Sequence, residues 1–393
     1  MEEAFRRTRK SGATGIDSLT GEDFARDMSG NIDALVNSCK SGEYRAPAVR
    51  RAYIPKGRND LRPLGIPTFS DKVLQRAVVM LLEPIYEQTF YDCSFGFRSK
   101  RSALDCIKAL RSTLDEYQGG YVLDIDIRTY FDSIPKAVLR ELIATRVRDG
   151  VITRMIGKWL NAGVMEKGQL SFHDLGTPQG GVISPLLANI YLHYVLDDWF
   201  YQTVLSNISG PAKLFRFADD FVVVMKSEAD ANRLLEALKK RFTKYGLRLH
   251  EGKSRLVDFR KPKDGCRKET FNFLGFTFYW GKGRKGTPLV KLKTAEDRFT
   301  RTCSKLTELC RRIRHEPIKE QRKRLNLLLT GHYRYFGVSF NTDRLWAVRR
   351  QATKLWFKWL KRRSQRRHLT WPDFVRIIEA FPLAEPRVTT RLW

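Results

Sequence analysis

The sequence lacks the features that would place the protein in a membrane or in an oxidising compartment. No run of about 18 consecutive apolar residues is present, although a membrane-spanning helix needs that length. The N-terminal residues MEEAFRRTRK contain no apolar segment like that of a secretory signal peptide. The six cysteines form no C-x-x-C pair, which argues against a zinc ribbon, and they are too few for a disulfide-based fold of 393 residues. We therefore expect a cytoplasmic protein with no membrane partner.

Acidic residues are scarce relative to basic ones. The chain has 72 Lys and Arg against 43 Asp and Glu, a formal net charge of +29. Residues 301–370 alone hold 20 Lys and Arg and four Asp and Glu, with aromatic residues interleaved. Basic side chains neutralise phosphates and aromatic rings stack on bases, so this segment predicts nucleic-acid binding. A solvated basic face over a Trp-rich helical core is the alternative, and an anionic membrane is less favoured because no lipidation motif accompanies the charge.

The spacing of apolar residues predicts a mixed α/β fold without repeats or low-complexity linkers. Helical periodicity occurs over 69–90, 184–200 and 230–245. Alternating or β-prone runs, which predict strands, occur over 49–54, 64–66, 121–127 and 271–280. Residues 213–225 predict a hairpin with two acids at its tip. After about residue 290 the sequence predicts long basic helices, and the change of composition over 285–295 is the best candidate for a domain boundary.

Carboxylates occur in unusually apolar surroundings at two places. Asp124 and Asp126 share one face of the strand predicted over 121–127, because strand side chains alternate with period two. Asp219 and Asp220 are flanked on both sides by aromatic and β-branched residues, which disfavour an uncompensated charge. Carboxylates from two strands can converge on Mg²⁺, and two such ions about 3.5–4 Å apart activate a hydroxyl and stabilise a leaving phosphate oxygen. The alternative is an exposed turn whose acids form ion pairs.

Three motifs connect these acids to a known family. The string FADD at 217–220 resembles the aromatic-Ala-Asp-Asp box of reverse transcriptases. The string DIRTYFD at 126–132 resembles their first catalytic motif, in which an aromatic residue follows an Asp by five positions. Between them, TPQGGVISPLLANIYL at 177–192 closely resembles the motif of group II intron-encoded reverse transcriptases. By the order and spacing of these motifs, the chain is identified as a member of that family.

The resemblance extends over nearly the whole chain. Further strings similar to motifs of the same group occur at 12–17, 54–67, 94–99, 247–253, 271–276, 362–371 and 381–383. Phe217 replaces the more usual Tyr of the catalytic box, which removes a hydroxyl but keeps the ring. The missing C-x-x-C pairs lead us to expect a bacterial-type member without the zinc-binding endonuclease domain, associated with RNA or the nucleoid.

The resemblance implies an α/β right-hand polymerase. Residues 1–120 would form the fingers and the start of the palm, and residues 121–288 the palm, with a fingers insertion at about 140–180. Residues 289–393 would form a basic helical thumb or maturase-like region, made of the helices that the sequence predicts there.

The same resemblance implies the catalytic and metal-binding residues. Asp126 and Asp219 are expected to bind two Mg²⁺ ions, which Mn²⁺ can replace, and Asp220 is expected to support them. Asp124 is set aside, because only Asp126 has the aromatic residue five positions later. Phe131 is that residue, and it is expected to act as a steric gate against the 2′-OH of ribonucleotides, which favours DNA synthesis.

Five further residues are expected to bind the nucleotide. Lys56 and Arg62 would hold the triphosphate, since Lys offers a point charge and Arg a fork suited to phosphate oxygens. Gln179 and Gly180 belong to a loop whose glycines let backbone approach the nascent base pair. Lys253 would assist by protonating the pyrophosphate leaving group. A solvated basic hairpin is the alternative for the first pair.

Arginines of the C-terminal segment are expected to bind structured RNA: Arg362, Arg363, Arg366 and Arg367. The expected function is RNA-directed DNA synthesis from an RNA template, a DNA primer and deoxynucleoside triphosphates, with intron RNA as a further partner. A domesticated relative used in antiphage defence, repair or CRISPR spacer acquisition is one alternative. An RNA-binding splicing cofactor with a vestigial polymerase is another, from a different class.

Overall fold

The computed structural model describes residues 1–55, 61–166, 168–172, 176, 180–263, 269–283, 285–363 and 369–392. It divides into two compact units, each built from two segments of the chain. Unit 1 combines Met1–Ser102 with Leu123–Leu256, and unit 2 combines Ala103–Val122 with Val257–Trp393. Within the described ranges, no helix combines the length and the apolar character that crossing a membrane requires.

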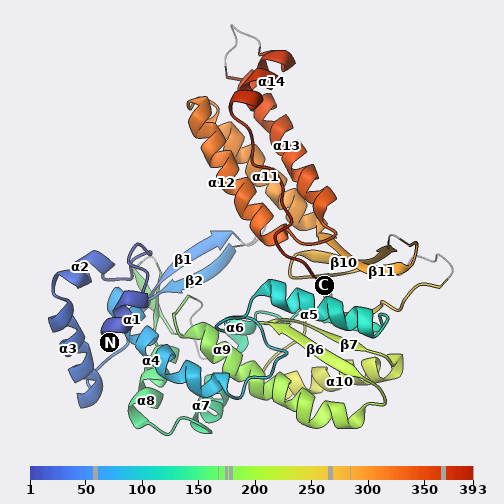
Figure 1. Cartoon of the computed structure of the whole chain (residues 1–393). Coiled ribbons are helices and arrows are strands. Elements are labelled where there is room, and N and C mark those ends of the chain that lie inside the picture. The colour runs from blue at the N-terminus through green and yellow to red at the C-terminus, as the bar shows by residue number, and fades with distance from the viewer. Residues whose placement is uncertain are drawn as a thin grey trace. The chain divides into compact units, whose positions relative to one another are not determined.

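Unit 1 begins with short helices that pack on a long one. Helices α1 (Glu2–Arg7), α2 (Gly21–Arg26) and α3 (Met28–Ser41) contact α4 (Phe69–Glu87), as Figure 1 shows. Their apolar faces share a core of Ala4, Phe24, Ile32, Phe69 and Val73. The predicted helix over 69–90 is confirmed, with its end at Glu87.

A four-stranded sheet follows, with the strand order β2-β1-β4-β5. Strands β1 (Val49–Pro55) and β2 (Leu61–Ile66) form an antiparallel hairpin, which confirms the two strands expected there. Strand β4 (Val164–Glu166) pairs in parallel with β1 and in antiparallel with β5 (Gln169–Ser171).

A second sheet has the order β6-β7-β3-β8 and is called the central sheet here. Strands β6 (Ala212–Phe217) and β7 (Asp220–Met225) form the predicted hairpin, and β7 lies beside β3 (Tyr121–Ile125). Strand β8 (Arg255–Asp258) lies at the edge of this sheet opposite β6.

Several helices lie between the strands of these two sheets along the chain. Helices α6 (Tyr130–Ser133), α7 (Lys136–Ala144) and α8 (Gly150–Leu160) come between β3 and β4. Helix α9 (Ser184–Leu192) runs on into the π-helical turns η1 (His193–Asp197) and η2 (Phe200–Val204), followed by the 3₁₀ turn η3 (Leu205–Asn207). The predicted helix over 184–200 is therefore present, but its second half is π-helical. Helix α10 (Glu228–Lys244) contacts β7.

Unit 2 contains a three-stranded antiparallel sheet in the order β11-β10-β9. The β-prone run over 271–280 is confirmed and forms strands β9 (Phe271–Phe273) and β10 (Phe276–Lys282). Leu274 and Gly275 adopt positive φ, 47° and 81°, and turn the chain back between the two strands. Strand β11 (Pro288–Thr294) coincides with the change of composition near 285–295. Helix α5 (Ala103–Glu116) packs against β11.

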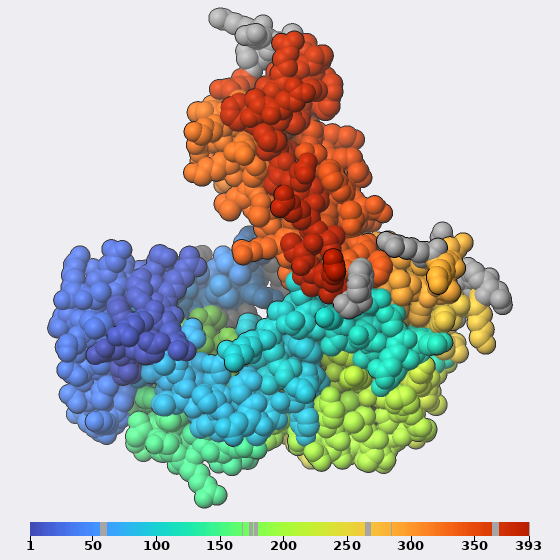
Figure 2. All heavy atoms as spheres, viewed as in Figure 1, coloured from blue at the N-terminus to red at the C-terminus, as the bar shows by residue number. Residues whose placement is uncertain are grey.

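The long helices at the C-terminus form a bundle. They are α11 (Glu296–Ile313), α12 (Ile318–Phe336), α13 (Thr342–Lys361) and α14 (Trp371–Ala380), and they confirm the helices predicted after residue 290. In Figure 2 the residues of these helices, drawn in orange and red, form one body. Trp356 is fully buried in the bundle core, where its indole N–H donates to Gln321 Oε1 at 2.8 Å.

Candidate active site

The acidic hairpin tip lies at the end of buried strands. Phe217 pairs with Asp220 across the turn, and Ala218 adopts a left-handed conformation with φ of 58°. Residues 221–225 of β7 are all buried, whereas Asp220 at the start of the strand is exposed. The apolar run therefore anchors the hairpin in the core and presents its two carboxylates at the tip, as the sequence predicts.

Asp126 follows β3 directly, and β3 is the neighbour of β7 in the central sheet. Asp126 Oδ2 lies 3.0 Å from Lys253 Nζ, and its carbonyl accepts from the backbone N–H of His250 at 2.8 Å. A cationic group therefore already occupies the position beside this carboxylate. The structure thus joins two residues that the sequence assigned to separate roles.

Asp124 has a different partner from Asp126. Its carboxylate lies 3.6 Å from Arg255 Nε, and burial raises the pKa of Asp124 to about 6, although Arg255 lowers it. Asp124 and Asp126 therefore each have a basic neighbour of their own.

Tyr130, four residues after Asp126, is hydrogen-bonded to α9 and lies within electrostatic range of Asp219. Its hydroxyl donates to the carbonyl of Ala188 in α9 at 2.6 Å. Burial raises the pKa of the Tyr130 phenol, and Asp219 raises it further. Asp219 therefore lies within electrostatic range of a ring that follows Asp126 by four residues.

The acids have the donor chemistry that Mg²⁺ prefers, because all of their donors are carboxylate oxygens. The ammonium of Lys253 beside Asp126 also shows that this position accommodates a positive charge. Among the residues that the structure describes, no three His, Cys, Asp or Glu side chains form a ready-made metal cluster.

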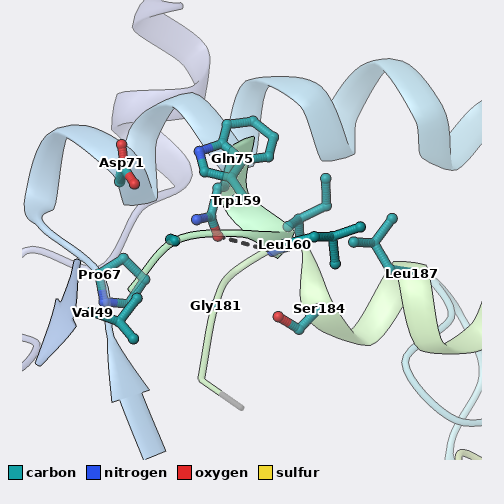
Figure 3. A pocket seen from close by; sticks show the side chains of 11 residues that line it. Val49, Pro67, Asp71, Gln75, Trp159, Leu160, Gly181, Ser184 and Leu187 are labelled. Carbon is teal, nitrogen blue, oxygen red and sulfur yellow. Dashed lines mark hydrogen bonds between the residues drawn. The ribbon is translucent and has the colours of Figure 1, made fainter. Parts of the chain in front are cut away.

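The loop before α9 is held by a side chain that the sequence analysis missed. Gln75 of α4 is buried, and its Oε1 accepts from the backbone N–H groups of Val182 and Ile183 at 2.8 and 3.3 Å. Figure 3 shows this amide reaching the loop between Gly181 and Ser184. Gln75 therefore pairs the backbone N–H of the N-cap residue Ile183 and that of Val182 before it, and so fixes the backbone that leads into α9.

Gly180 lies close to the backbone of the β1–β2 hairpin, and its predicted approach to the nascent base pair stays a prediction. It has φ of 113°, and an added Cβ would lie 2.7 Å from the carbonyl oxygen of Gly65 in β2. Any side chain at this position would therefore separate the loop from the β1–β2 hairpin. Gln179 lies outside the described residues.

The β1–β2 hairpin carries one of the two residues expected at the triphosphate. Arg62 is exposed and pairs with Ile54 across the hairpin, whereas Lys56 lies outside the described residues. The hairpin is tied to β4 by the Tyr53 hydroxyl, which donates to Glu166 at 2.8 Å.

Phe131 lies in the short helix α6, directly after the fully buried Tyr130. Its ring is partly buried and packs edge to face with Tyr130 at a centroid distance of 5.4 Å. Gly176, with φ of 92°, lies against the backbone of Phe131 and Asp132, where an added Cβ would come within 3.1 Å. The backbone that carries the Phe131 ring is therefore tightly packed against Gly176.

Arg98 could be a template contact or a structural residue on sequence grounds, and the structure favours the second. Its side chain is 3% exposed and pairs with Glu87 at 2.8 Å. It also donates to the carbonyls of Tyr91 and Ser94 at 2.7 and 2.9 Å.

The predicted RNA-binding arginines are only partly described. Arg362 and Arg363 are exposed at the end of α13, where Arg362 lies over the Trp359 ring at 5.4 Å and Arg363 donates to the His315 carbonyl. Arg366 and Arg367 lie outside the described residues.

Comparison with known proteins gives consistent matches. A family profile described as reverse transcriptase (RNA-dependent DNA polymerase) matches residues 54–278. Protein YkfC of Escherichia coli is 30% identical over 330 residues, covering 76% of this chain and 84% of that protein. The group II intron-encoded protein LtrA of Lactococcus lactis is 43% identical over 190 residues, covering 48% of this chain but only 31% of LtrA.

More distant matches agree with these. Nuclear intron maturase 2 of Arabidopsis thaliana is 26% identical over 183 residues, covering 37% of this chain and 25% of that protein. Among solved structures, telomerase from Candida albicans has a TM-score of 0.50 at 12% identity, covering 95% of this chain and 68% of that one. This last likeness supports the right-hand polymerase fold alone.

Proposed function

Because the chain belongs to the reverse transcriptase family, we propose that it is an active RNA-directed DNA polymerase of the group II intron type. The observation that carries the proposal is the acidic hairpin tip beside β3 in the central sheet, with Asp126 directly after β3. This arrangement presents carboxylates from two neighbouring strands at the positions of two family motifs.

Asp126 and Asp219 would hold the metal ions, with Asp220 in support. When bound, two Mg²⁺ ions, or Mn²⁺ in their place, supply Lewis-acid stabilisation of the attacking hydroxyl and the leaving oxygen. The protein must hold these carboxylates in place, since phosphoryl transfer depends almost entirely on positioning and charge stabilisation. Lys253, 3.0 Å from Asp126, would neutralise that carboxylate before substrate binds and then supply a proton to the pyrophosphate.

The remaining site residues would select and orient the nucleotide. Lys56 and Arg62 would contact the triphosphate from the β1–β2 hairpin. Gln179 and Gly180 would face the nascent base pair, with the loop held by Gln75. Phe131 would reject a 2′-OH by its ring, which is fixed from below by Tyr130.

We propose the domain roles in the ranges that the motifs imply. Residues 1–120 would form the fingers and the start of the palm, and residues 121–288 the palm. Residues 289–393 would serve as a thumb and RNA-binding surface, using arginines such as Arg362 and Arg363. Nucleic-acid partners would be an RNA template, a DNA primer and structured intron RNA.

The test is single-nucleotide extension of a DNA primer on an RNA template in Mg²⁺. Asp219→Asn keeps the size of the side chain and removes its charge, so we expect a rate loss of about 10²-fold or more. Asp33→Asn, at an exposed position of α3, is the matched control and should extend like wild type. Wild-type protein that binds RNA but adds no nucleotide would instead favour the splicing cofactor with a vestigial polymerase.

A further inference from the structure

A buried ion pair lies beneath the acidic hairpin tip. Arg216, in β6, and Asp197, in η1, both have side chains that are 0% exposed. The guanidinium donates twice to the carboxylate, from Nε to Oδ1 at 2.8 Å and from Nη2 to Oδ2 at 2.5 Å. This two-point contact uses the planar fork of arginine and fixes the orientation of its third nitrogen.

That third nitrogen faces the turn of the hairpin. Arg216 Nη1 donates to the carbonyl of Ala218 at 3.1 Å and to Asn189 Oδ1 at 3.0 Å. Ala218 has φ of 58°, a left-handed conformation that is unfavourable for a non-glycine residue and persists where surrounding contacts enforce it. The peptide that Arg216 holds is the one that leads into Asp219.

The segment 93–96 braces the same turn from another side. The backbone of Arg216 pairs with it, donating to the Cys93 carbonyl at 2.8 Å and accepting from the Phe95 N–H at 2.8 Å. The Asn189 amide donates to the Gly96 carbonyl at 2.7 Å. An added Cβ on Gly96 would lie 2.3 Å from the Ala218 nitrogen, so this segment touches the turn itself.

The π-helical turn explains how one helix supplies two members of this network. In a regular α-helix, residues eight positions apart differ by about 80° around the axis. A π turn contains one residue more than an α turn, which brings the two positions back toward a common side. Asn189 in α9 and Asp197 at the end of η1 both reach Arg216 in this way.

A buried ion pair is a poor device for stability alone, because desolvation of two charges offsets their attraction and apolar residues of similar size often do as well. It is a good device for fixing one geometry, since each donor has a defined direction. Arg216 donates hydrogen bonds at the same time to the Asp197 carboxylate, to the side-chain oxygen of Asn189 and to the Ala218 carbonyl in the turn.

We propose that Arg216 is a positioning residue that, with Asp197 and Asn189, holds the Ala218–Asp219 peptide and so sets the direction of the Asp219 carboxylate. This inference rests on the proposed role of Asp219. The network acts through the backbone, and Arg216 has no contact with substrate in this assignment.

The test compares Arg216→Lys with Arg111→Lys. Arg111 is the matched control because it is also buried, pairs with a carboxylate and donates to two backbone carbonyls, but within unit 2. Titration with primer and template first gives the fraction of molecules that can extend a primer, called competent molecules here. The rate of nucleotide addition per competent molecule is then measured across Mg²⁺ concentrations. Arg216→Lys should lower that rate about tenfold or more and raise the Mg²⁺ concentration for half-maximal rate several-fold. Arg111→Lys should lower the melting temperature and leave both quantities unchanged.

Asn189→Ala is the second variant, since it leaves the ion pair intact and serves if Arg216→Lys does not fold. It should shift the rate per competent molecule and the Mg²⁺ requirement in the same direction by a smaller factor, with the affinity for primer and template unchanged. Wild-type values of both quantities in the folded variants would overturn the proposal. Failure of the proposed function is recognised separately, because wild-type protein would then bind RNA but add no nucleotide. Failure of the role assigned to Asp219 is also distinct, because Asp219→Asn would then extend primers like wild type.

Discussion

The central sheet of unit 1 and the helical bundle of unit 2 place charge in opposite ways. In unit 1 the Arg216–Asp197 pair lies in the interior with both side chains 0% exposed. In the bundle α11–α14 the core is built from apolar residues such as Trp356 and Leu329, and Arg362 and Arg363 are exposed. Arginine thus forms a buried, hydrogen-bonded ion pair in one region and remains exposed to solvent in the other.

This difference separates two kinds of effect on activity. A buried, fully hydrogen-bonded charge fixes the geometry of the groups around it, so its loss should change the rate of the chemical step. An exposed charge remains solvated and contributes through release of counterions from phosphates, so its loss should change affinity and salt dependence. Substitutions in the two regions should therefore be distinguishable by which kinetic quantity they alter.

The largest effect is expected for Asp126→Asn, directly after β3 of the central sheet. Removing this carboxylate charge should reduce nucleotide addition by about a hundred- to a thousandfold, because the proposed metal ligand would stabilise charge that develops in the transition state. Rates are measured by rapid-mixing primer extension at saturating template.

Asp124→Asn is the control for that experiment, because Asp124 has the same residue type two positions away but pairs with Arg255. We expect it to keep most of the wild-type rate. Equal losses in both variants would contradict the assignment of Asp126 alone as the ligand of this strand.

How far the sequence predicts this site depends on whether a local pattern marks the residue or only contacts with residues distant in the sequence place it. The acidic tip and the close approach at Gly180 follow from local patterns, namely two acids inside an apolar run and glycine in a loop. Arg216 carries no such pattern, because a charge on a strand usually faces solvent. Its only signal is that it shares a strand face with Leu214, which is buried.

Gln75 and the β9–β10 turn were missed for related reasons. Gln75 lies on the apolar face of α4 four residues after Asp71, so two polar residues at helical spacing on a buried face were the available signal. The turn at Leu274 and Gly275 is flanked by β-prone residues on both sides, and one glycine does not distinguish a turn from a continuous strand. Long-range contacts decide both cases, and a single sequence does not contain them.

The second largest effect concerns sugar selection by Phe131, a packed side chain of unit 1. Phe131→Ala should raise ribonucleotide incorporation relative to deoxynucleotide by roughly one to two orders of magnitude, because the steric conflict with the 2′-OH is removed. The measurement is the ratio of kcat/KM for the two nucleotides. Phe97→Ala, at an exposed aromatic position of the same unit, should leave the ratio unchanged. If Phe131→Ala polymerises with an unaltered ratio, another side chain is the gate.

The third effect concerns the exposed charge of the bundle. Replacing four arginines by alanine should weaken binding to structured RNA: Arg362, Arg363, Arg366 and Arg367. The slope of log affinity against log salt concentration should become shallower by about one for each phosphate contact that is lost. Nucleotide addition at saturating template should change much less. Binding is measured by titration at several salt concentrations.

A double variant of Arg6 and Arg7 provides the comparison, because these exposed arginines already pair with Glu2 and Glu3 of the same helix. It should leave the salt slope as in wild type. Loss of polymerisation with unchanged RNA affinity in the bundle variant would assign these residues to a thumb role instead.

The smallest effect uses one buried titratable group from each unit. Burial raises the pKa of Asp71 in unit 1 to about 7, although a hydrogen bond from Tyr44 lowers it. Burial lowers the pKa of His332 in unit 2 to about 4. Both side chains are neutral in the folded protein at about pH 5–6, but in the unfolded chain Asp71 is ionised and His332 becomes protonated as the pH falls.

The two groups should therefore give opposite pH dependence of stability. Between pH 6 and pH 5 the folded state binds more protons than the unfolded state at Asp71 and fewer at His332. On lowering the pH by this one unit, the stability of wild type relative to Asp71→Asn should rise by about 1 kcal/mol, and relative to His332→Gln it should fall by about 1 kcal/mol. The measurement is denaturant unfolding of the three proteins at both pH values. If both stability differences change in the same direction with pH, at least one of these side chains is charged in the folded protein. The contrast between the units would then not extend to their buried titratable groups.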